Sequence, residues 1–116
     1  MTLDALVRDF AECVSRQSEA VANGDATTGN KYAKRYTAAF AKLRAHGDDG
    51  RNALAVLLSD ARPDVRVMAA AYLLRHCEDR AKAVLEAEAQ GKGIVAFGAS
   101  ESLKRWSEGT WNLDPP

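Results

Sequence analysis

The side chains best suited to proton transfer near neutral pH are the two histidines, His46 and His76. His76 precedes Cys77 and Glu78, so three residue types that can bind a metal stand side by side. A zinc site needs three or four ligands from elements that converge, and one tripeptide supplies only one such element. We therefore interpret His76 as a histidine at a helix end that contacts backbone carbonyls, and we expect neither a metal nor a cofactor.

Carboxylates occur in adjacent pairs at Asp48-Asp49 and Glu78-Asp79, a pairing that acid–base catalysis can use. Adjacent acids between helices more often cap a helix and face solvent. The chain also lacks the Gly-x-Ser-x-Gly, P-loop and dinucleotide-binding fingerprints, and the glycines on either side of Lys92 are typical of a turn. These patterns predict a protein that is not an enzyme.

Two groups of basic residues could contact phosphate: one face of the helix expected near residue 35, and a row at equivalent positions of three helices. The first group is Lys31, Lys34, Arg35 and Lys42, and the second is Arg44, Arg75 and Lys104. Phosphate recognition normally comes with excess positive charge, but here 16 Lys and Arg residues balance 16 Asp and Glu residues. We therefore favour a solvated face with ion pairs, and we keep nucleic-acid binding as the alternative.

The composition is typical of one helical domain. Of the 116 residues 47% are hydrophobic, alanine is abundant, and alternating β-branched residues are almost absent. The first residues carry acids rather than the basic start of a secretion signal, and no apolar run is long enough to span a bilayer. We expect a single domain over residues 1–116, no membrane contact, a cytoplasmic location, and two buried free thiols at Cys13 and Cys77.

Apolar residues at helical spacing predict six helices with short connections. The expected ranges are 3–22, 30–45, 51–58, 65–77, 80–90 and 94–108, with an irregular tail from about residue 109. The helix at 65–77 is apolar on nearly all sides, so we expect it to be buried among the others. We expect residues 23–29 to form the longest loop, Ala83, Val84 and Ala87 to face inward, and Trp111 to fold back over an exposed end.

An internal repeat relates the helices expected at 30–45, 65–77 and 94–108. Its equivalent positions are Ala38, Ala69 and Gly98, then Ala39, Ala70 and Ala99, then Leu43, Leu74 and Leu103. Small residues one turn before a leucine let helices approach closely, and a repeat of this length indicates stacked helical pairs. We therefore expect three pairs of helices that use the same packing.

A specific pattern runs through the middle of the chain: an Asp before a turn, Val-Arg at the start of the next helix, paired alanines and a leucine. Its residues are Asp60, Pro63, Val65, Arg66, Ala69, Ala70 and Leu73. Over residues 51–77 this pattern resembles a HEAT repeat, and the flanking helical pairs depart from it as terminal repeats do. The resemblance implies an α-α superhelix of three HEAT-like pairs, in which Asp60 and Arg66 join neighbouring repeats.

From Tyr36 to the region of Trp106 the chain also resembles a family of small uncharacterised bacterial proteins with a HEAT-like fold, and no activity carries over from that family. Some HEAT-type enzymes hold iron with repeated His-Glu pairs, and this chain has no His-Glu dipeptide.

Stacked helical pairs present an extended surface whose exposed residues can vary without disturbing the core. We therefore predict a non-catalytic protein-binding module or scaffold that binds another protein. An immunity protein that neutralises a bacterial toxin is one form of this hypothesis, by analogy alone. The alternative is a nucleic-acid-binding helical-repeat protein that uses the basic row. The expected contact surface lies on the second helix of each pair and comprises Lys34, Arg35, Arg44, Arg75, Glu101, Lys104 and Arg105.

Overall fold

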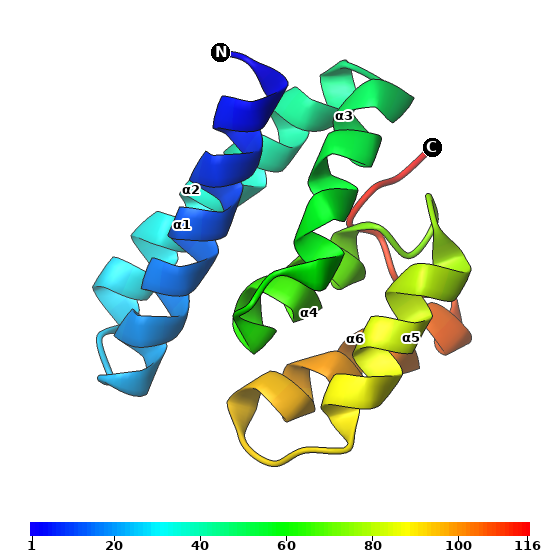
Figure 1. The fold of residues 1–116 in the computed structure, drawn as a ribbon. Helices are drawn as coiled ribbons and strands as arrows, with labels where there is room; N and C mark the ends of the chain where they lie inside the picture. The colour runs from blue at the N-terminus through cyan, green and yellow to red at the C-terminus, as the bar shows by residue number, and fades with distance from the viewer. The chain divides into compact units, whose positions relative to one another are not determined.

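The computed structural model describes all residues 1–116 and is entirely helical, as the sequence predicts (Figure 1). Its α-helices are α1 (Leu3–Ala22), α2 (Ala26–Ala45), α3 (Asp48–Leu54), α4 (Pro63–Tyr72), α5 (Glu78–Ala89) and α6 (Ile94–Glu108), with a 3-10 helix, η1 (Ala55–Ser59), after α3. The chain divides into two compact units, residues 1–57 and 58–116. None of the helices combines the length and apolarity that a bilayer crossing demands.

In the first unit α1 and α2 form a helical hairpin with a shorter connection than the sequence predicts (Figure 1). The predicted loop at residues 23–29 is wrong, because α2 already begins at Ala26. Asp25 caps this helix, and its carboxylate accepts a hydrogen bond from the Thr28 amide at 3.1 Å. The cap and the packing of the buried Gly29 outweigh the low helix propensity of these residues.

The core of the first unit lies between the facing sides of α1 and α2. Phe10, Val14 and Leu43 are almost fully buried there, and Phe10 meets Tyr36 edge to face with ring centroids 5.8 Å apart. The start of α1 is fixed by Thr2, whose hydroxyl oxygen accepts from the Ala5 amide at 3.1 Å. The predicted bounds of this helix are confirmed.

The short helix α3 packs against the last turns of α2. It begins three residues earlier than predicted, directly after Gly47, whose φ of 65° turns the chain. Asp48 and Asp49 then lie in its first turn, where carboxylates are favourable. At Gly50 the two backbones approach so closely that a β-carbon would overlap the carbonyl oxygen of Leu43 and lie 2.6 Å from its carbon.

The second unit is built on α4, which starts at Pro63 as its first helical residue. The predicted C-terminal bound of the helix at 65–77 is wrong, because α4 ends at Tyr72 and the following residues form turns. Its predicted burial is confirmed: Val65, Ala70 and Leu74 are at most 1% exposed. The three alanines at one repeat position, Ala39, Ala70 and Ala99, are likewise all buried.

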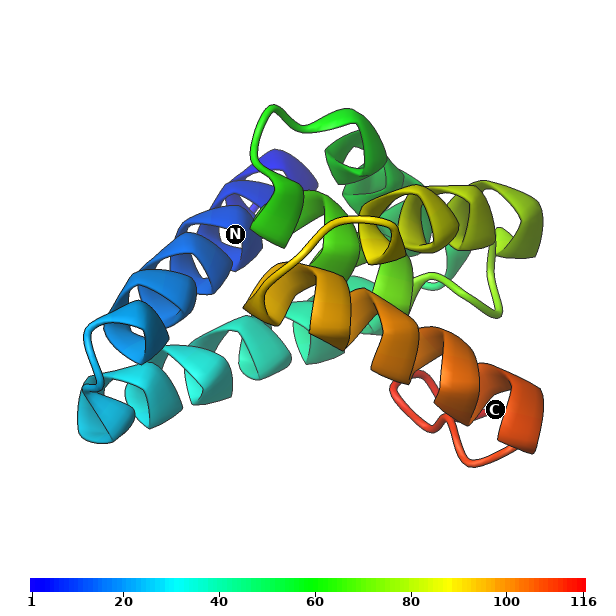
Figure 2. The same ribbon diagram turned by 90° about the horizontal axis from the view of Figure 1, so that it is seen from below.

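The helices α5 and α6 run side by side in both views (Figures 1 and 2). The bounds predicted for α6 are confirmed, but the inward face predicted for α5 is wrong. Of the residues predicted to face inward, Ala83 and Ala87 are exposed and Val84 is half-buried, whereas Ala81 and Leu85 are fully buried. Burial of Leu85 removes much more apolar surface from water than burial of an alanine, so the leucine sets the orientation of the helix.

We expect Ala70→Leu to destabilise the protein, because Ala70 is fully buried in α4 and extra methylene groups overpack a filled core at a cost of about 1–3 kcal/mol. Ala83→Leu is the matched control on the exposed face of α5 and should change stability by less than about 0.5 kcal/mol. Urea denaturation of both variants measures the difference. Equal midpoints for the two variants would mean that the core around Ala70 has room for a larger side chain.

Candidate functional site

Two large apolar side chains project into solvent from the first turn of α6. Ile94 is 68% exposed and Phe97 is 66% exposed. Because Ala96 and Ala99 bury the opposite side of this helix, the 3.6-residue period turns Ile94 and Phe97 outward together. Glu101 and Lys104 continue the same side at helical spacing, and we call these four residues the α6 stripe.

Charged residues of both signs follow the apolar end of the α6 stripe along the helix. Lys104 and Arg105 are exposed, and Glu101 is half-buried. An apolar centre with a polar border is the usual composition of a protein-binding surface. Glu101, Lys104 and Arg105 belong to the contact surface predicted from the sequence, whereas Phe97 does not. The signal was available, since Phe97 falls on the helix face opposite Ala96 and Ala99.

The basic face of α2 is partly occupied by contacts within the first unit. Arg35 donates to the Asp9 carboxylate at 3.2 Å, and the charges of Arg35 and Lys31 lie 5.5 and 5.6 Å from the centre of the Tyr32 ring. Lys34 is exposed and, with Ala38, lines a shallow hollow along α2. Lys34 and Lys42, which are both exposed, are therefore better placed for an external ligand than Arg35 and Lys31.

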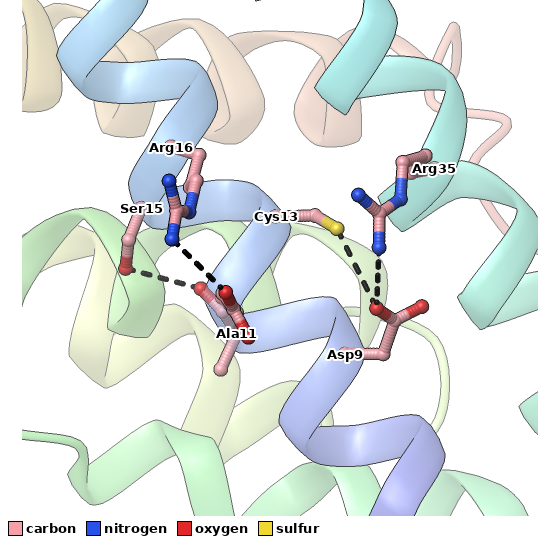
Figure 3. Close-up of polar contacts among 7 residues, drawn as sticks. Asp9, Ala11, Cys13, Ser15, Arg16 and Arg35 are labelled. Carbon is pink, nitrogen blue, oxygen red and sulfur yellow. Dashed lines mark hydrogen bonds and ion pairs between the residues drawn. The ribbon is translucent and has the colours of Figure 1, made fainter.

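The Asp9 carboxylate also accepts a weak hydrogen bond from the thiol of Cys13 at 3.7 Å (Figure 3). Burial, and then the negative charge of Asp9, raises the pKa of Cys13, while the Arg35 charge opposes this shift. Burial likewise raises the pKa of Cys77. A thiol whose pKa is raised is a poor nucleophile at neutral pH, so neither cysteine is prepared for covalent chemistry. Burial was predicted for both cysteines; Cys13 is buried, but Cys77 is only partly so.

The predicted row of Arg44, Arg75 and Lys104 is divided between the units, with Arg44 half-buried at the end of α2 in the first. Arg75 binds residues near the end of the chain. Its Nε donates to the Asp114 carbonyl at 2.8 Å, and its guanidinium forms an ion pair with the Asp114 carboxylate at 3.3 Å. Sequence patterns do not show this contact, because 39 residues separate the partners.

Asp60 and Arg66 are predicted to join neighbouring repeats. Both form hydrogen bonds within the turn before α4. The Asp60 carboxylate accepts from the Arg62 amide at 2.9 Å. Arg66 donates to the carbonyls of Asp60 at 2.7 Å and Ala61 at 3.1 Å, and it also forms an ion pair with Glu88 of α5. Arg66 therefore fixes the turn and links α4 to α5, whereas Asp60 acts locally.

The histidines lie apart from any cluster of ligand groups. His46 is exposed at the end of α2, where its amide donates to the Leu43 carbonyl, and His76 is half-buried. Within residues 1–116 no three His, Cys, Asp or Glu side chains are grouped as metal ligands. The adjacent acids Glu78 and Asp79 lie in the first turn of α5, at the helix start where they were predicted. Neither side chain caps the helix, because α5 begins at Glu78 without a side-chain cap.

Comparison with known proteins gives a family and a structural relative. The family described as Domain of unknown function (DUF2019) matches residues 4–105. The crystal structure of the protein RPA1889 from Rhodopseudomonas palustris CGA009 is similar, with 27% identity and a TM-score of 0.89 over 97% of this chain and 93% of that chain. No curated protein matches the chain.

Proposed function

The chain belongs to the DUF2019 family, whose function is unknown, and we propose that it is a non-catalytic protein-binding module of the cytoplasm. The observation that carries this proposal is the exposure of Ile94 and Phe97 beside each other on α6. Single apolar residues are common on protein surfaces, but an adjacent aromatic and aliphatic pair exposed by two thirds is a typical anchor for a partner. Their contact with a partner would remove this apolar surface from water.

We further propose that the helical pairs are HEAT-like repeats, with α2, α4 and α6 as the second helices. The equivalent burial of Ala39, Ala70 and Ala99 supports this assignment, and so does the ion pair that links Arg66 of α4 to Glu88 of the following pair. In such an arrangement the exposed residues of the second helices contact partners. Lys34 and the α6 stripe fit this role, whereas Arg35 and Arg75 already have partners within the chain.

The charge distribution favours a protein over a nucleic acid as the partner. The formal net charge is zero, and Glu101 lies within the α6 stripe, where it would repel phosphate. Toxin neutralisation is a special form of the proposal and rests on analogy. In that form, the captured partner would be a secreted or injected toxin.

Affinity capture from a lysate of the native bacterium tests the proposal with Phe97→Glu. We expect the wild-type protein to retain a specific protein and the variant to lose it, because a charged group in place of a central aromatic anchor typically costs 2 kcal/mol or more, about 30-fold in affinity. Val56→Glu is the matched control, because Val56 is also 66% exposed but lies in η1.

Capture that both variants retain equally would exclude the α6 stripe as the contact surface. Recovery of nucleic acid alone, sensitive to nuclease and to Lys34→Glu, would support the alternative function. Lys34→Glu suits this arm better than a change at Arg75, since Arg75 has structural contacts that its replacement would remove.

A further inference from the structure

The tail (residues 110–116) folds back onto the second unit and makes the contacts of a bound peptide. Figure 2 shows it returning beside the last turns of α6. The indole nitrogen of Trp111 donates to the Ala71 carbonyl at 2.7 Å, and the Trp111 ring meets Trp106 edge to face with centroids 5.2 Å apart. Trp111 was predicted to fold back over an exposed end, and its contact with the end of α4 confirms this.

Arg75 holds the other half of the tail. In addition to its two contacts with Asp114, its Nη2 donates to the Pro115 carbonyl at 3.3 Å. The Asp114 side chain is 1% exposed, whereas that of Arg75 is 42% exposed. A buried carboxylate needs a cation nearby to offset its loss of hydration, and the Arg75 guanidinium at 3.3 Å provides it. The hydrogen bonds of Arg75 hold the backbone carbonyls of Asp114 and Pro115.

The groups that receive the tail all belong to the helical body: the Ala71 carbonyl, the Arg75 guanidinium and the Trp106 ring. We call these three groups the tail site. The Ala71 carbonyl and the Trp106 ring contact the indole of a Trp. The Arg75 guanidinium contacts both the carboxylate and the backbone carbonyl of an Asp three residues after that Trp. The tail itself has no helix or strand, and it is joined to α6 through Gly109, whose φ of 77° turns the chain away from the helix.

We propose that the tail site is a peptide-binding site for a partner segment with Trp followed three residues later by Asp, and that the tail occupies it as an internal competitor. The inference goes beyond the proposed function and does not depend on the α6 stripe. An attached ligand has an effective concentration in the millimolar range, so a partner segment must displace the tail to bind. Release of the tail would free the Arg75 guanidinium from its contacts with Asp114 and Pro115.

The full chain with Trp111→Ala and Asp114→Ala tests this inference, because both changes release the tail and leave the tail site intact. A fluorescent peptide with the sequence of residues 110–116 is titrated into this variant and into the wild-type protein, with binding followed by fluorescence polarisation. We expect saturable binding to the variant and at least 10-fold weaker binding to the wild type. Binding should be lost when Arg75→Ala is added, or when the peptide has Lys at its Asp position.

No saturable binding to a variant with wild-type helix content would overturn the inference. If the variant loses helix content, the test is made on the wild-type protein instead, by adding the unlabelled peptide at several millimolar. The nuclear magnetic resonance signals of Arg75 Nε and Trp106 Nε1 should then shift with the peptide and stay unchanged with the Lys-containing peptide. Unchanged signals with both peptides would overturn the inference.

Discussion

Gly50→Ala is expected to destabilise the protein by about 3 kcal/mol, at the upper end of the usual range for overpacking. The reason is steric: the added β-carbon would meet the backbone of Leu43, which cannot rotate away as a side chain can. Relief requires α3 to move off the end of α2, with loss of contacts in the core of the first unit. At about 4 °C per kcal/mol for a chain of this size, the melting temperature should fall by roughly 12 °C.

Gly98→Ala is the matched control, since Gly98 is also a helical glycine. A β-carbon there would meet no atom within 4 Å. Alanine restricts the unfolded chain more than glycine does, so this change should stabilise the protein by up to about 1 kcal/mol. Differential scanning calorimetry compares the two variants with the wild type. Similar melting temperatures for both would contradict the close approach of α2 and α3.

Arg66→Ala is expected to cost about 2–3 kcal/mol in the free energy of unfolding. The change removes hydrogen bonds to the Asp60 and Ala61 carbonyls and the ion pair with Glu88, and hydrogen bonds from charged groups typically contribute about 1.5–3 kcal/mol. The Arg66 side chain is 24% exposed and that of Glu88 22%, so solvent screens this pair less than a surface pair.

Arg16→Ala provides the comparison for Arg66. Arg16 pairs with Glu12 one turn away on α1, at 3.4 Å, with both side chains more than half exposed. Such surface pairs contribute little, so this variant should unfold within about 0.5 kcal/mol of the wild type. Guanidinium chloride denaturation measures both changes. If Arg66→Ala has an equally small effect, Arg66 does not hold the turn before α4.

Helix class and most helix positions follow from the sequence because the periodicity of apolar residues reports burial directly. Leu6, Val7, Phe10 and Val14 predict α1, and all four are buried. The errors arise where a single local interaction decides. Asp25 caps α2 earlier than the composition of residues 26–29 indicates, and one leucine, Leu85, decides which side of α5 faces inward.

The candidate site was less predictable than the fold, for two physical reasons. The spacing of exposed charged residues does not distinguish a contact surface from a surface that only faces water. The predicted contact residues therefore include both Lys104, which is exposed, and Arg75, which binds Asp114. Contacts across long sequence separations also leave no local pattern. The pairing of Trp111 with the end of α4 depends on the path of the chain after Gly109.

Each unit of the chain contains one free cysteine, Cys13 in residues 1–57 and Cys77 in residues 58–116. Because burial raises the pKa of both, each thiol becomes reactive when its surroundings open. The protein therefore carries two natural reporters of unfolding, of which Cys13 is buried and Cys77 is already partly accessible in the folded state. Pulsed alkylation followed by mass spectrometry would record the opening of each half without any introduced label. Simultaneous labelling would identify one cooperative folding unit, and sequential labelling would show that the two halves melt separately.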